Sequence, residues 1–167
     1  MLATVIVMLA AATAPLQDTV APMPPTPEQT RYLEGLRTVA RGVAQLRDGI
    51  DRVARTQQSR DTLRQRQAGR RLGGLCTTAR SFITSGRPRM VSTAYADSMR
   101  IIARQLVVRI DSIAKFLPSC STTAGRQPAS VAADLLNRMR AYETALAAFR
   151  AALAPPKPDS IKTPTQH

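Results

Sequence analysis

Apolar residues recur at alternating spacings of three and four, and this pattern constrains the fold more than any other feature of the sequence. The spacing places such residues along one side of an α-helix, at the interval that coiled coils use. The first series consists of Tyr32, Leu36, Val39, Val43, Leu46, Ile50 and Val53. Just before it, Thr26, Pro27 and Gln29 have the pattern of a capping box with proline at the first helical position. The sequence therefore predicts a long first helix that begins at Pro27.

Three further helices are predicted from the same spacing and from the positions of glycine and proline. They are expected at about Arg70–Thr84, from Pro88 to Pro118, and from Pro128 to Leu153. Gly73 and Gly74 offer places where the second of the four helices could bend or break. Hydrophobic residues make up 44% of the sequence and aromatic residues only 4%, which favours an aliphatic helical core over strands. We therefore expect an all-α fold, an antiparallel bundle of about four helices in one domain that spans residues 27–153.

The first residues, MLATVIVMLAAATA, form an apolar run of about 13 residues. This run is too short to span a bilayer core of roughly 30 Å, but it has the length of the hydrophobic part of a signal peptide. We therefore expect residues 1–14 to be a signal peptide and the protein to be periplasmic or secreted, with no stable membrane span. No Lys or Arg precedes the run, and Pro15 makes cleavage after Ala14 unfavourable. Cleavage after Ala12, an uncleaved anchor and a plain mature N-terminus stay open as alternatives.

Two further segments are rich in proline and have no apolar periodicity. Residues 15–26 are expected to form a Pro-rich linker. Residues 154–167 are expected to form a flexible tail rich in Pro and Thr, because they carry too little apolar surface to order themselves.

Cys76 and Cys120 are the only cysteines in the sequence. An even number of cysteines in an exported protein favours a disulfide. This bond would close a loop of about 45 residues and stabilise the fold by roughly 4 kcal/mol through loop-closure entropy. It would join the second helix to the loop after the third, where Cys120 is expected. The alternative is a cytosolic protein with two buried thiols.

The segment Arg55–Arg71, RTQQSRDTLRQRQAGRR, contains six arginines and one acid. If the first helix continued to Gln67 it would measure about 60 Å, against about 40 Å for the third and fourth helices. The segment is therefore interpreted first as the projecting, solvated end of the first helix, and second as an anion-binding site. On a continuous helix the arginines form two groups on different sides. The candidate anion-binding group is Arg60, Arg64 and Arg71, and the other group is Arg52, Arg55, Arg66 and Arg70.

Motifs for catalysis or metal binding are scarce, so no metal or cofactor is expected. The only histidine is His167, in the expected tail, which leaves cysteines and serines without a histidine partner for nucleophilic catalysis. Ser112 and Lys115 match the S-x-x-K pattern of penicillin-binding proteins and β-lactamases, but the companion S-D-N and K-T-G motifs are absent. Asp111 is also a ready structural partner for Lys115 at the i,i+4 spacing. We therefore expect a protein that is not an enzyme.

The sequence has 24 Lys and Arg residues against 11 Asp and Glu residues, a formal net charge of +13. Such a charge attracts polyanions. For an exported bundle, the favoured function is a binding or structural role in the cell envelope, in which the basic surface contacts an anionic component or another protein. The alternatives are nucleic-acid binding with salt-dependent affinity, a charge that only keeps the protein soluble, and an enzyme of unrecognised type. The coiled-coil spacing also permits self-association.

Overall fold

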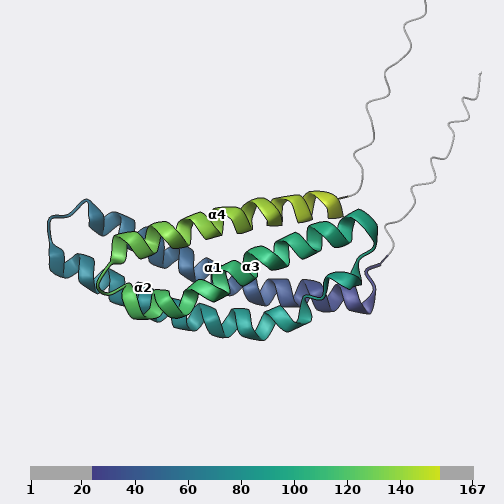
Figure 1. The fold of residues 1–167 in the computed structure, drawn as a ribbon, viewed down its shortest axis with the longest axis horizontal. Coiled ribbons are helices and arrows are strands. Elements are labelled where there is room, and N and C mark those ends of the chain that lie inside the picture. The colour runs from purple at the N-terminus through teal and green to yellow at the C-terminus, as the bar shows by residue number, and fades with distance from the viewer. Residues whose placement is uncertain (1–23, 155–167) are drawn as a thin grey trace, which may run out of the picture.

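The computed structural model describes residues 24–154, which form a bundle of antiparallel helices (Figure 1). The helices are α1 (Pro27–Gln57), α2 (Thr62–Gly86), α3 (Asp97–Thr123) and α4 (Pro128–Leu153). Two short 3-10 turns, η1 (Arg87–Arg89) and η2 (Ser92–Ala94), connect α2 to α3. The predicted all-α, four-helix fold is confirmed. The predicted signal peptide, most of the linker and nearly all of the tail lie outside the described residues.

The start and the buried face of α1 agree with the sequence pattern. Thr26 Oγ1 accepts a hydrogen bond from the Gln29 backbone N–H at 3.3 Å, and the Gln29 side chain accepts one from the Thr26 N–H at 3.0 Å. These two bonds form the predicted capping box. All seven apolar residues of the first series are buried, and α1 packs most extensively against α2. The three-and-four spacing therefore identified the face of α1 that enters the core.

Three aromatic side chains join α1, α4 and the α2–α3 connection at the end of the bundle where α1 begins. The Tyr32 ring stacks on Phe149 with centroids 5.3 Å apart and meets Tyr95 edge-on at 5.2 Å. The Tyr32 hydroxyl donates a hydrogen bond to the Ala103 carbonyl oxygen at 2.9 Å. Burial raises the pKa of Tyr32 and of Tyr95 above the ordinary value of a phenol. This cluster closes the end of the core remote from the turn between α1 and α2.

The segment Arg55–Arg71 is not one continuous helix. α1 ends at Gln57, and α2 begins at Thr62 after a turn. Asp61 caps α2, because its Oδ1 accepts hydrogen bonds from the backbone N–H groups of Leu63 at 2.9 Å and Arg64 at 3.1 Å. The interpretation of this segment as the end of a single helix is therefore wrong, and the segment is the turn of a helical hairpin.

The physical reason for this turn lies in the apolar pattern on its two sides. The buried face of α1 stops at Val53, and buried residues resume at Ala68 and Leu72 of α2. A straight helix would carry those two side chains away from the core, whereas the turn brings them back onto α1. α2 consequently starts earlier than the predicted Arg70. The tip of the α1–α2 hairpin extends past the turn between α3 and α4 (Figure 1).

The beginning of α3 also differs from the prediction. α3 starts at Asp97 rather than after Pro88, because η1 and η2 occupy the chain between α2 and α3. Met90 and Tyr95 in this connection bury their side chains in the core. Met90 and Tyr95 are five residues apart, a spacing that does not place two side chains on the same face of a helix. The irregular backbone of the connection allows both to reach the core.

The C-terminal end of α3 continues past the proline that was expected to end it. Pro118 lies inside α3, and its side chain is exposed. Helix continues to Thr123 because Cys120 and Ala124 bury their side chains beyond the proline. The hydroxyl of Ser121 also donates to the Pro118 carbonyl at 2.7 Å. Cys120 is therefore on the helix, and the expectation of a loop at this position is wrong.

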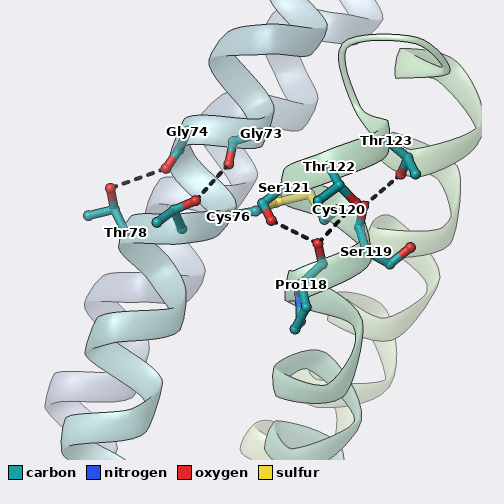
Figure 2. The surroundings of a disulfide bond; sticks show 11 residues. Gly73, Gly74, Cys76, Thr78, Pro118, Ser119, Cys120, Ser121, Thr122 and Thr123 are labelled. Carbon is teal, nitrogen blue, oxygen red and sulfur yellow. Dashed lines mark hydrogen bonds between the residues drawn. A yellow bond between two sulfur atoms is a disulfide. The ribbon is translucent and has the colours of Figure 1, made fainter.

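A disulfide joins Cys76 of α2 to Cys120 of α3, as predicted (Figure 2). The two Cα atoms are 6.1 Å apart, and both side chains are buried. Gly73, one turn before Cys76, allows the helices to approach, because a Cβ atom there would lie 3.0 Å from the Ser121 carbonyl oxygen. Gly73 and Gly74 both lie inside α2 and do not break it.

Candidate functional site

Four arginines line one cleft at the hairpin end of the bundle. The cleft has a volume of about 410 Å³ and separates the last turns of α1 from the first half of α2. The residues that line it are Arg52, Arg55, Thr56, Arg64, Gln67, Ala68 and Arg71. We call this feature the arginine cleft.

Helical spacing and the hairpin turn together build the arginine cleft. On α2, Arg64, Gln67, Ala68 and Arg71 follow one another at intervals of three, one and three, which places them on one face of the helix. On α1, Arg52 and Arg55 lie on adjacent turns. The turn makes the two helices antiparallel, so these two faces lie opposite each other. The four arginines then line one hollow.

Two of the four arginines in the cleft have carboxylate partners. Arg52 pairs with Asp48 at 2.7 Å, and Arg64 pairs with Asp61 at 3.2 Å. Within residues 24–154, no carboxylate oxygen lies within 4.0 Å of a guanidinium nitrogen of Arg55 or Arg71. The cleft therefore has four positive charges and two adjacent negative ones. Its excess charge and its open guanidinium groups suit an anion that carries several oxygen atoms.

The structure distributes the predicted arginines differently from the two groups expected on a continuous helix. Arg64 and Arg71 line the arginine cleft, whereas Arg60 lies in the turn and does not. Arg52 and Arg55 were expected on a different side of a continuous helix. They line the arginine cleft as well, because the turn reverses the chain direction. The N-cap at Asp61 was the signal that could have revealed this arrangement. Anion binding by Arg60, Arg64 and Arg71 stays a prediction.

Arg66 and Arg70, the remaining members of the second group, lie beside a different hollow. It has a volume of about 480 Å³ and is lined by Arg66, Arg70, Gly125 and Arg126. Gly125 and Arg126 belong to the turn between α3 and α4. We call this feature the second basic hollow. The arginines of α2 therefore line two separate hollows, the arginine cleft and the second basic hollow.

Ser112 of the S-x-x-K pattern contacts an arginine of α4. Ser112 Oγ accepts a hydrogen bond from Arg138 Nη1 at 2.9 Å. The expected pairing of Asp111 with Lys115 is replaced by a two-pronged contact in which Arg87 donates to both Asp111 oxygens, at 2.7 and 3.0 Å. Arginine forms this geometry where lysine cannot, and it links the α2–α3 connection to α3.

Residues 24–154 contain no group of three or more His, Cys, Asp or Glu side chains that could hold a metal ion. Among the helices of that region, none combines the length and the apolar character needed to cross a bilayer. His167 lies outside the described residues.

Comparisons with protein-family models, with curated proteins and with solved structures find no match to this chain.

Proposed function

We propose that the protein is an exported, non-enzymatic binding protein that contacts an anionic component of the cell envelope through the arginine cleft. The observation that carries this proposal is the meeting of four arginines in one hollow, two of them without a carboxylate partner within residues 24–154. Placing these positive charges together raises the local electrostatic potential beyond that of scattered surface arginines. The repulsion between these charges destabilises the free protein slightly. A bound anion offsets that repulsion.

The chemistry of the guanidinium group favours phosphate or a similar oxyanion as the group that is bound. Arginine donates two parallel hydrogen bonds to neighbouring oxygen atoms, and it stays charged at any pH at which the protein is folded. Binding to a chain of phosphates releases counterions, so its affinity falls steeply as the salt concentration rises. A partner with several linked phosphates would occupy more than one of the four guanidinium groups.

The double variant Arg55→Gln/Arg71→Gln tests the cleft. We expect it to bind fluorescently labelled linear polyphosphate about tenfold more weakly, or worse, and to show a shallower salt dependence, because two phosphate contacts are lost. Fluorescence anisotropy over about 50 to about 500 mM salt measures both quantities.

The matched control for this measurement is Arg104→Gln/Arg109→Gln, which removes the same charge from exposed positions of α3. We expect its affinity to fall much less than that of the cleft variant. Equal losses in the two variants would mean that net charge alone attracts the polyanion. Absence of polyphosphate binding by the parent protein at low salt would remove the proposed function altogether.

Export is supported by the apolar run at residues 1–14 and by the disulfide between Cys76 and Cys120. Disulfides persist in oxidising compartments and are rare in the cytosol. We expect the protein purified from its natural host to lack the residues up to about Ala14 and two thiol protons. Intact mass spectrometry measures both, and a full-length chain with two free thiols would contradict export.

A further inference from the structure

The most exposed large hydrophobic side chain of the described residues lies at the tip of the α1–α2 hairpin. Leu63, in the first turn of α2, is 73% exposed. Nearby residues of the turn are polar, and Asp61 is engaged as the N-cap of α2 and as the partner of Arg64. Leu63 neither enters the core nor caps the helix, so its side chain is available to a partner.

Arginines flank this leucine on more than one side. The arginine cleft lies between α1 and α2, and the second basic hollow lies between α2 and the α3–α4 turn. Arg60 lies in the hairpin turn itself. Figure 1 shows that the hairpin tip projects beyond the neighbouring turn. A flat surface that meets this end of the bundle would contact both Leu63 and the arginines around it.

We infer that the hairpin tip docks on a membrane surface that carries anionic phosphate headgroups, with Leu63 entering the headgroup–acyl boundary and the two arginine groups binding the phosphates around it. This inference rests on the proposed anion-binding function and names the partner for it. An apolar side chain surrounded by cations is the arrangement by which peripheral proteins combine burial of apolar surface with attraction to anionic lipid. The protein rests on the surface through this tip, and the bundle stays outside the bilayer.

A bilayer fits these observations better than a soluble linear polyanion. A single polyanion strand offers no apolar phase for Leu63, and it would have to bend around α2 to reach both the arginine cleft and the second basic hollow. Headgroups spread over a plane reach both at once. Duplex DNA likewise presents phosphates without an apolar layer, and the segment Arg55–Arg71 contains no aromatic side chain on which bases could stack.

The variant Leu63→Ser tests this inference with two probes in parallel. The first probe is vesicles of phosphatidylcholine and phosphatidylglycerol, with pure phosphatidylcholine vesicles as the uncharged comparison. The second probe is linear polyphosphate. We expect Leu63→Ser to lower the affinity for the anionic vesicles about fivefold or more and to leave the affinity for polyphosphate unchanged, because only the bilayer offers an apolar phase. Co-sedimentation measures the first affinity and fluorescence anisotropy the second.

The control variant is Ile101→Ser, which removes an apolar side chain that is 61% exposed on α3. We expect it to bind both probes as the parent does. A second variant, Arg66→Gln/Arg126→Gln, removes charge from the second basic hollow and should weaken vesicle binding about tenfold. Because all these side chains are exposed, the circular dichroism spectrum and the thermal midpoint should match those of the parent.

The outcomes separate this inference from the proposed function. Binding to polyphosphate without binding to anionic vesicles would overturn the membrane partner and leave anion binding intact. Equal vesicle affinity of Leu63→Ser and the parent would overturn the role of the leucine and with it the docking mode. If none of the anionic probes bound, both proposals would fail.

Discussion

Replacing both cysteines, as Cys76→Ala/Cys120→Ala, is expected to lower the free energy of unfolding by about 4 kcal/mol. The disulfide spans 44 residues of sequence, so its loss frees a long loop in the unfolded chain. Both side chains are buried, and the smaller alanines would leave unfilled space between α2 and α3. Urea unfolding followed by circular dichroism measures the change.

The control for this prediction is the parent protein unfolded in the presence of a strong reductant. Its stability should fall to near that of the double variant once the thiols are free. A decrease below about 1 kcal/mol in the double variant would mean that loop closure contributes little to the stability of this bundle.

Gly69→Ala and Gly74→Ala, two substitutions on the same helix, should change the stability in opposite directions. A Cβ atom on Gly69 would overlap the carbonyl oxygen of Ala124 and lie 2.9 Å from Cβ of Pro128. α2 and the turn between α3 and α4 would have to separate, at an expected cost of about 2 kcal/mol or more. A Cβ atom on Gly74 would meet nothing within 4 Å, so the higher helix propensity of alanine should raise the stability by about 0.5–1 kcal/mol.

Thermal and urea unfolding of the two glycine variants, together with the parent, measure this difference. Each variant is the natural control for the other, because both make the same chemical change five residues apart on α2. If Gly69→Ala were as stable as Gly74→Ala, the close contact between α2 and the α3–α4 turn would be contradicted.

The helices that could be predicted are those whose apolar faces continue without interruption. The series on α1 identified its buried face, and the capping box at Thr26 placed its start, since both signals depend only on neighbouring residues. The pairing of Cys76 with Cys120 was also predictable, because the sequence has no other cysteine.

The structure differs from the predictions where contacts between distant residues outweigh the local helix propensity. Glycine lowers helix propensity, yet Gly73 lies within α2 because the backbone of Ser121 approaches it closely. Pro118 lies within α3 because Cys120, beyond it, is buried and bonded to α2. The approach of Ser121 to Gly73 cannot be read from the local sequence, and the predicted disulfide does not show whether Cys120 lies on a helix or in a loop. The residues that line the arginine cleft also cannot be read from the local sequence, because they come together only when the chain reverses near Asp61.

The most direct test of anion binding by the arginine cleft is a nitrogen–proton correlation spectrum of the arginine side chains during titration with linear polyphosphate. We predict that the Nε–Hε signals of Arg55 and Arg71 shift most and saturate together, and that Arg52 and Arg64 follow at the same concentration. The signals of Arg104 and Arg109 on α3 should stay nearly fixed. Small shifts spread evenly over all arginines, without saturation, would contradict a site and leave only the attraction due to net charge.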